Sequence, residues 1–208
     1  MSENLDFQDI VQLWQEAAEG HIHPLWNVDQ ALYWESGLTQ AQQAAEYTPK
    51  GGRVLDFGAG NGRVSIPLAK LGFDVIAVDS SPGMLAKLKE HAAKSKATVK
   101  TAASDGAGLG AAVRPGKVDT AVVRAVFIHH DPESIARLVK QIAGVIKKGG
   151  HLLADWPTGT EQVRDAFNGI TVMSHRHRQV IAQAAGLAPV VDTENAATGQ
   201  PSVWRKTR

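Results

Sequence analysis

The sequence contains no cysteine. This absence excludes disulfide bonds, metal sites built on thiolates and every reaction that needs a cysteine nucleophile, including covalent attack on a cytosine ring. Long apolar runs are also missing, since none approaches the roughly 20 residues that a membrane-spanning helix needs. The N-terminal stretch lacks the basic and apolar regions of a secretory signal. We therefore expect a cytoplasmic protein with no membrane partner.

An excess of charge of either sign is absent as well. The 208 residues include 22 Lys and Arg against 21 Asp and Glu, which leaves a formal net charge of +1. With so little net charge, the protein has no overall electrostatic field that would attract nucleic acid or an anionic membrane. The hydrophobic share of 43% is that of an ordinary globular domain, and the length suits one domain.

The first fifty residues have the apolar spacing of helices rather than of strands. Helices are expected over residues 5–19, 28–34 and 39–47. The stretch 48–52, Thr-Pro-Lys-Gly-Gly, is typical of a turn. Residues 1–50 are therefore expected to form a helical cap before an α/β body over residues 51–208.

The body alternates short apolar runs with helical patterns. Strands are expected over residues 53–57, 74–78, 98–102, 118–124, 151–156, 187–193 and 202–206, and helices over residues 64–71, 82–94, 134–146 and 175–185. Such alternation predicts a parallel sheet with helices on both faces. The last two strands are joined without a helix, and a short connection gives an antiparallel pair. Residues 157–173 show no clear pattern and are expected to include a loop over the sheet.

A glycine-rich turn follows the first expected strand. Its glycines are Gly58, Gly60 and Gly62. They allow a tight turn and let a ligand approach the backbone with no Cβ in the way. A dinucleotide fingerprint would be G-x-G-x-x-G, but here Arg63 stands where the last glycine belongs. Asp56 would repel a pyrophosphate and attract a cation, which disfavours a nicotinamide-dependent oxidoreductase.

Asp79 ends the second expected strand, about 20 residues after Gly58. A carboxylate at that distance reaches the ribose hydroxyls of a bound nucleoside in folds of this kind. A glycine turn with a ribose-binding acid suits any cofactor that carries adenosine. The spacing of the turn and the position of Asp56 favour a cationic one.

These motifs resemble those of the class I S-adenosylmethionine-dependent methyltransferases, whose first motif is acid-x-G-x-G-x-G. The resemblance also covers Asp79, residues 103–106, the strand-four stretch 118–130 and the glycine pair at 149–150. It extends over about residues 50–208 and implies a Rossmann-like, mostly parallel seven-stranded sheet with an antiparallel last strand. It implies S-adenosyl-L-methionine as cofactor, with the contacts Asp56, Gly58, Ala59, Gly60, Gly62, Asp79, Ser80, Ser104, Asp105, Gly106, Arg124 and Ala125.

Methyl transfer from a sulfonium is a one-step, in-line substitution, so the protein acts mainly by positioning. A general base helps when the nucleophile must lose a proton. His129 and His130 follow strand four and are both candidates for that base. The sequence does not choose between them, and either can instead pack against or cap the next helix. Asp131 is expected to cap that helix.

The acceptor is expected to be a small molecule methylated on an O or N atom. The residues expected to line its pocket are Trp26, Tyr33, Trp34, His129 and Trp156. Aromatic rings there would stack on an acceptor or flank the sulfonium, although Tyr33 and Trp34 are equally suited to core packing. Base-modifying relatives carry an N-P-P-Y-like tetrapeptide after strand four, and none is present, so a nucleic-acid partner is not expected.

The sequence leaves three functions possible. The chain is a methyltransferase for small molecules, a protein or peptide methyltransferase, or a nucleoside-binding regulator without transfer activity. Two His-x-His pairs, at 21–23 and 175–177, lack a supporting third ligand, so no metal is expected. Residues 175–178 are expected to be a solvated basic face. The protein is expected to be a monomer or a homodimer.

Overall fold

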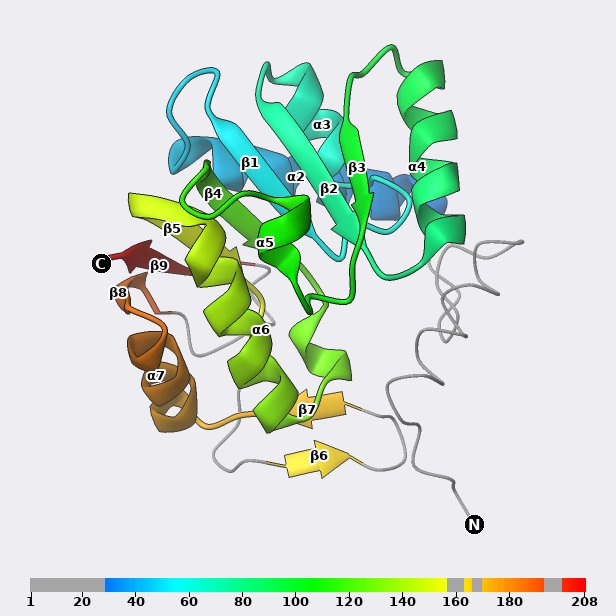
Figure 1. Cartoon of the computed structure of the whole chain (residues 1–208). Helices are drawn as coiled ribbons and strands as arrows, with labels where there is room; N and C mark the ends of the chain where they lie inside the picture. The colour runs from blue at the N-terminus through cyan, green and yellow to red at the C-terminus, as the bar shows by residue number, and fades with distance from the viewer. Residues whose placement is uncertain (1–28, 157–162, 166–169, 193–199) are drawn as a thin grey trace.

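The computed structural model describes residues 29–156, 163–165, 170–192 and 200–208. In chain order its elements are α2 (Gln30–Glu46), β1 (Arg53–Phe57), α3 (Ser65–Lys70), β2 (Asp74–Asp79), α4 (Pro82–Lys94), β3 (Lys100–Ala103), α5 (Leu109–Ala112), β4 (Val118–Val123), the 3₁₀ turn η1 (Phe127–His129), α6 (Pro132–Val145), β5 (Ile146–Ala154), β6 (Val163–Asp165), β7 (Ile170–Val172), α7 (His175–Ala184), β8 (Leu187–Val191) and β9 (Ser202–Lys206). Figure 1 shows their arrangement. The expected helix over residues 5–19, Trp26 and the pair at 21–23 lie outside the described residues.

Seven strands form one sheet in the order β3-β2-β1-β4-β5-β9-β8. The first five are parallel, and β9 runs antiparallel to both β5 and β8. The predicted Rossmann-like, mostly parallel seven-stranded sheet is therefore confirmed. The chain moves outward from β1 in one direction and from β4 in the other, so a crevice opens where β1 and β4 end.

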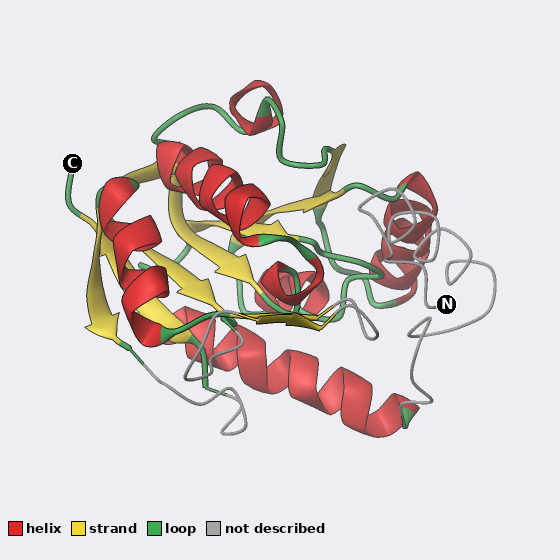
Figure 2. Cartoon of the chain, turned by 90° about the horizontal axis from the view of Figure 1, so that it is seen from below, coloured by secondary structure: helices red, strands yellow, loops and turns green. Residues whose placement is uncertain are grey.

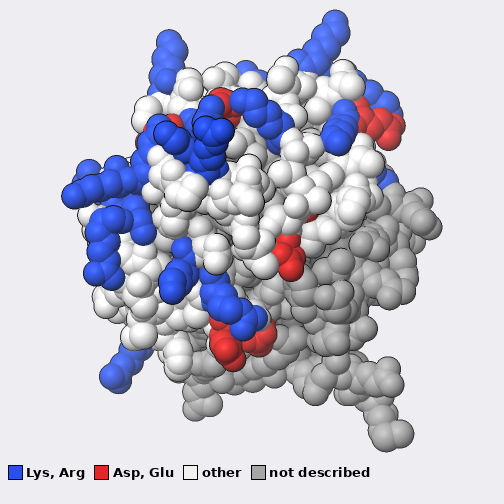
Figure 3. All heavy atoms as spheres, in the orientation of Figure 1, with Lys and Arg blue, Asp and Glu red and all other residues white. Residues whose placement is uncertain are grey.

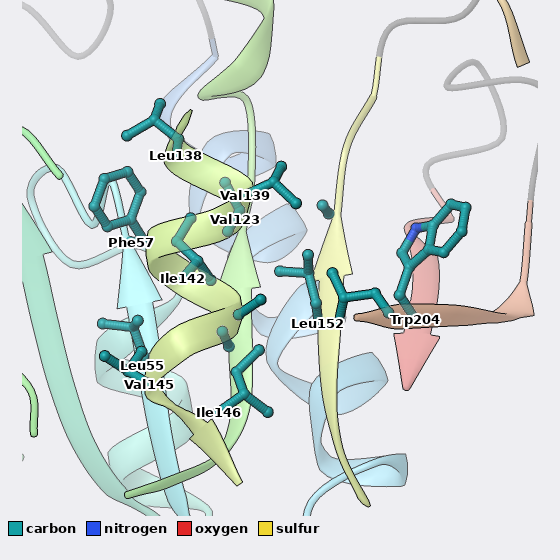
Figure 4. Close-up of a cluster of buried hydrophobic side chains, with 14 of the residues drawn as sticks. Leu55, Phe57, Val123, Leu138, Val139, Ile142, Val145, Ile146, Leu152 and Trp204 are labelled. Atoms are coloured by element: carbon teal, nitrogen blue, oxygen red, sulfur yellow. The ribbon is translucent and has the colours of Figure 1, made fainter. Parts of the chain in front are cut away.

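Helices cover both faces of this sheet because successive strand residues point to opposite sides. Val54 packs with Ala44 of α2, whereas its neighbour Leu55 packs with Ile142 of α6. Figure 4 shows the apolar side chains between α6 and the central strands, and Figure 2 shows α2 as the long helix along the sheet's opposite face. This two-sided core fixes the positions of the strand ends that carry the site.

The N-terminal helices predicted over residues 28–34 and 39–47 are a single helix, α2, so that prediction was wrong in detail. Asp29 caps its first turn by accepting from a backbone N–H at 3.0 Å. Gly37 does not interrupt the helix. A Cβ there would lie 2.2 Å from the carbonyl oxygen of Arg63, so glycine allows the helix to pack closely on the segment after β1.

The fifth strand of the sheet begins earlier than expected. It was expected over residues 151–156, but β5 already begins at Ile146, which pairs with Val118 of β4. Lys147 is held there by an ion pair with Asp119 at 2.7 Å. The stretch 157–173, which has no clear sequence pattern, contains the antiparallel strands β6 and β7.

The predicted cap at Asp131 is confirmed. Asp131 accepts from the backbone N–H of Ser134 at 2.9 Å, and Ser81 and Ser174 cap α4 and α7 in the same manner. The basic stretch 175–178 is not a fully solvated face, because Arg178 is buried and forms an ion pair with Asp192. The side chain turns inward at the start of α7 because the β8 end supplies this carboxylate.

On the face shown in Figure 3, many of the Lys and Arg side chains gather on the left and upper left of the view, and a few Asp and Glu lie among them. Within the described part of the chain, no helix is long and apolar enough to span a bilayer.

Candidate functional site

The glycine bend, residues 58–62, lies at the crevice between β1 and β4. The backbone N–H groups of Gly58 and Ala59 both donate to the carbonyl oxygen of Val78, at 2.8 and 3.0 Å, which ties the bend to the end of β2. Gly58, Gly60 and Gly62 have φ angles of +75°, +52° and +94°, a region that side chains with a Cβ rarely adopt. A Cβ on Gly60 would meet nothing within 4 Å, so this part of the bend faces open space.

Asp79 closes the bend from the second strand. One carboxylate oxygen accepts from Gly60 N–H at 2.7 Å and the other from Ser81 N–H at 2.8 Å. Burial raises the pKa of Asp79, and these backbone hydrogen bonds oppose the rise. A carboxylate offers about four lone-pair sites, so about two remain for further donors such as a vicinal diol. Ser80 lies half-buried beside it.

Asp56 lies beneath the bend and is almost fully buried, with 2% of its surface exposed. The Ser65 hydroxyl donates to its carboxylate at 2.5 Å. Burial raises the pKa of Asp56 to about 6, although the Ser65 hydrogen bond and the charge of Arg63 both act to lower it. A bound cation near this carboxylate would recover part of that electrostatic cost.

Side chains of α2 reach the bend directly. The Tyr33 hydroxyl donates to the Asn61 side chain at 2.8 Å, and the Arg63 guanidinium lies over the Tyr33 ring, 5.0 Å from its centre. Trp34 contacts both Tyr33 and His91 edge to face, with ring centres 5.6 and 5.3 Å apart. The structure therefore brings together Tyr33, Trp34 and the glycine bend, which are far apart in the sequence.

The ends of β4 and β5 meet through an ion pair. Arg124, whose side chain is 3% exposed, lies with its Nε 3.1 Å from the Asp155 carboxylate. The same carboxylate oxygen accepts from Ala125 N–H at 3.2 Å. A second contact joins Arg124 to Gln43 of α2 at 3.4 Å. Burial raises the pKa of Asp155, and the charge of Arg124 opposes this.

The loop after β3 holds three of the predicted residues. Ser104 accepts from Gly106 N–H at 3.1 Å, and Asp105 accepts from Ala107 N–H at 2.9 Å. Asp105, Gly106 and His130 line one cavity of about 280 Å³ together with residues of α6. His129 is half-buried in η1, directly after the segment that follows β4.

Trp156 lies in the core with 3% of its surface exposed. Its ring packs 4.9 Å from Phe127 and 6.2 Å from Trp204. Its predicted role toward an acceptor stays a prediction, as does that of Trp26. Within the described ranges, no group of three or more His, Asp or Glu side chains is placed to hold a metal ion.

Sequence reasoning missed four residues that shape the site: Gln43, Asn61, His91 and Asp155. Asp155 directly follows the apolar strand β5, much as Asp79 ends β2, and that signal would have found it. Asn61 was visible only as a spacer between two glycines. Gln43 and His91 lie on helices whose packing brings them to the site, so no local pattern marks them.

Comparison with known proteins agrees with this geometry. A family model described as a methyltransferase domain matches residues 54–150. A ubiquinone biosynthesis O-methyltransferase of Xanthomonas campestris pv. campestris is 34% identical over 109 residues, which make up 52% of this chain and 44% of that protein. This chain thus matches less than half the length of that relative.

Two solved structures show the same fold. The magnesium protoporphyrin IX methyltransferase of Synechocystis PCC 6803, solved with bound SAM, has a TM-score of 0.67 at 19% identity, and the match covers 96% of each chain. The [4+2]-cyclase SpnF has a TM-score of 0.71 at 18% identity, over 90% of this chain and 74% of its own. Since the second protein is a cyclase, the fold by itself does not specify the reaction.

Proposed function

We propose that this protein, whose residues 54–150 match the methyltransferase-domain family, is a methyltransferase. It transfers a methyl group from S-adenosyl-L-methionine to an O or N atom of a small molecule. The observation that carries the proposal is the pairing of Asp79 with Gly60 at the glycine bend. It presents a carboxylate with spare lone pairs beside a backbone that has no side chain in the way.

The residues present fit such a donor. The Asp79 carboxylate would accept from its ribose hydroxyls, and the open space beside Gly60 would admit its amino-acid part. Ser104, Asp105 and Gly106 would meet the nucleobase from the loop after β3. When bound, S-adenosyl-L-methionine supplies a methyl group on a positively charged sulfur.

The charged groups of the chain itself favour binding of a cation beside the glycine bend. Asp56, Asp79 and Asp155 all have raised pKa values because burial penalises their charged forms. A positive ligand stabilises those charged forms. Tyr33, whose hydroxyl donates to Asn61 of the bend, and Trp34, which contacts Tyr33 edge to face, would add cation–π attraction.

His129 is the stronger candidate for the general base. His130 lines the cavity beside Asp105 and Gly106, the residues expected at the nucleobase end. His129 lies in η1, one turn after Ala125, near the crevice where the reacting groups would meet. Its imidazole would accept the proton that an acceptor hydroxyl or amine loses.

The acceptor is proposed to be a small aromatic or otherwise flat molecule that packs on Tyr33 and Trp34. We further propose that the protein acts in the cytoplasm as a monomer or homodimer, without a nucleic-acid or membrane partner. The near-neutral charge of the whole chain supports that part of the proposal.

Calorimetric titration with S-adenosylhomocysteine, the product of the donor, tests the proposal directly. Binding by the wild-type protein and severe loss of binding in Asp79→Ala are expected, with NAD as the ligand that should not bind. Asp74→Ala, an acid at the other end of β2, is the matched control and should bind normally. Formation of S-adenosylhomocysteine from the donor in a screen of phenols and amines then separates an enzyme from a non-catalytic binder. Wild-type affinity in Asp79→Ala would overturn the proposed site.

A further inference from the structure

Asp155 stands at the centre of a small set of contacts after β4. One of its carboxylate oxygens receives both the Ala125 N–H, at 3.2 Å, and the Arg124 side chain, with Nε at 3.1 Å. The backbone N–H of Asp155 in turn donates to Val123 at 3.0 Å, which joins the two strand ends. The carboxylate is therefore fixed relative to β4, and it also contacts the segment that follows β4.

Ala125 has a backbone conformation that this set must hold. Its φ angle is +56°, in the left-handed region that alanine disfavours. Its side chain is exposed, so no packing of its own methyl group explains the conformation. Non-glycine residues persist in this region where surrounding contacts over-determine them. Here the contact on the residue's own N–H comes from Asp155.

The left-handed turn at Ala125 sets the position of the next residue, Val126. A Cβ built on Gly58 would lie 2.2 Å from the Val126 side chain, so the glycine bend and the segment after β4 fit closely against each other. The same turn leads into η1, which carries His129. One backbone conformation therefore places both a wall of the expected donor site and the candidate base.

We propose that Asp155 is a positioning residue, which holds Ala125 in its left-handed conformation and thereby aligns Val126 and His129 with the glycine bend. It acts through Ala125 and Arg124 and touches no reacting group. The inference rests on the proposed function, because the site that it aligns is the one proposed to bind S-adenosyl-L-methionine.

A double-mutant cycle between positions 155 and 125 tests the proposal, with the affinity for S-adenosylhomocysteine as readout. Without the carboxylate, alanine should leave the left-handed region, and Asp155→Ala should weaken binding by about five- to thirtyfold. Glycine adopts φ near +56° without that penalty. In the Ala125→Gly background the same change at 155 should therefore weaken affinity clearly less, and the loss that remains comes from the broken Arg124 pair. An equal loss in both backgrounds, or no loss in either, would overturn the proposal.

A second variant leaves the Arg124 pair intact in case Asp155→Ala does not fold. Ala125→Val adds atoms only at an exposed position, but a β-branched residue strongly disfavours a positive φ. It should weaken binding relative to Ala125→Gly, because glycine adopts the left-handed conformation without strain. Equal affinities for valine and glycine at position 125 would contradict the proposed role of the conformation.

Amide hydrogen exchange separates this inference from the proposed function. The Ala125 N–H should exchange faster in Asp155→Ala than in the wild type, and Asp105→Ala, an exposed acid on another loop, should leave it unchanged. Failure of the wild type to bind S-adenosylhomocysteine would refute the function alone, since exchange still reports on the turn. Unchanged exchange at Ala125 would refute the positioning role even in a protein that binds the product.

Discussion

Asp56→Asn is expected to make the protein more stable at neutral pH and worse at binding its donor. The carboxyl group is almost completely buried, and its one hydrogen-bond donor among the side chains described is the Ser65 hydroxyl, at 2.5 Å. Asparagine has nearly the same shape, and its amide oxygen can accept that hydrogen bond. The substitution therefore removes a buried charge and little else.

The magnitude follows from the pKa of Asp56. Burial raises it from an ordinary 3.8 to about 6, which corresponds to about 3 kcal/mol of folding free energy at pH values above both. The folded protein binds the extra proton, so wild-type stability should fall as the pH rises from about 4 to about 6 and stay level above that. Asp56→Asn should lack this fall. The free energy of unfolding of Asp56→Asn should exceed that of the wild type by about 3 kcal/mol near pH 7.5 and by about 0.5 kcal/mol near pH 4.

Urea denaturation of both proteins across this pH range measures the effect. Asp74→Asn is the control, because the hydrogen bond from Lys100 and the charge of Arg53 lower the pKa of Asp74. Asp74→Asn should lower the free energy of unfolding slightly, as is usual when an exposed ion pair is lost. The reasoning is refuted if Asp56→Asn is less stable than the wild type at pH 7.5, or if its stability has the same pH dependence. In titrations with S-adenosyl-L-methionine the variant should bind more weakly, since the cation loses a buried negative partner.

Three further predictions concern the bend, the base and the last helix. Gly58→Ala should lower stability by at least about 1–2 kcal/mol in urea denaturation, because φ is +75° and the new Cβ would lie 2.2 Å from the segment after β4; an unchanged midpoint would contradict this. Once an acceptor is found, His129→Ala should lower kcat with little change in donor affinity, whereas His130→Ala should mainly change donor affinity. The opposite result would assign the role of general base to His130 instead of His129. Arg178→Met should destabilise the fold by up to about 3–5 kcal/mol, because the Asp192 carboxylate loses its guanidinium partner and keeps, among the described residues, only the longer contacts with His175 and Gln179. A second change, Asp192→Leu, should restore much of that loss.

Local chemistry explains why the sequence predicted so much of the fold. Apolar runs of strand length alternate with helical patterns, and Ser81, Asp131 and Ser174 mark helix starts by satisfying backbone N–H groups within three residues. Asp79 was found in the same way, since it ends a strand at a distance that parallel topology brings back to the glycine bend. Each of these signals depends only on nearby residues.

The errors came where partners far along the chain decide the conformation. The two helices expected over residues 28–34 and 39–47 are one helix, in which the missing Cβ of Gly37 lets α2 pack against Arg63. Arg178 looked solvated at a helix start, yet the end of β8 supplies Asp192 to pair with it in the interior.

The sequence by itself determined the seven strands of the main sheet, their mostly parallel arrangement, the glycine bend and the acid that faces it, because strand and turn chemistry is local. Only the tertiary structure decided that Asn61 would meet Tyr33 and that Asp155 would hold Ala125 in a left-handed turn. The physical reason is that a strained backbone or a buried ion pair is stable only when groups from several elements converge on it, and that convergence exists only in the folded chain.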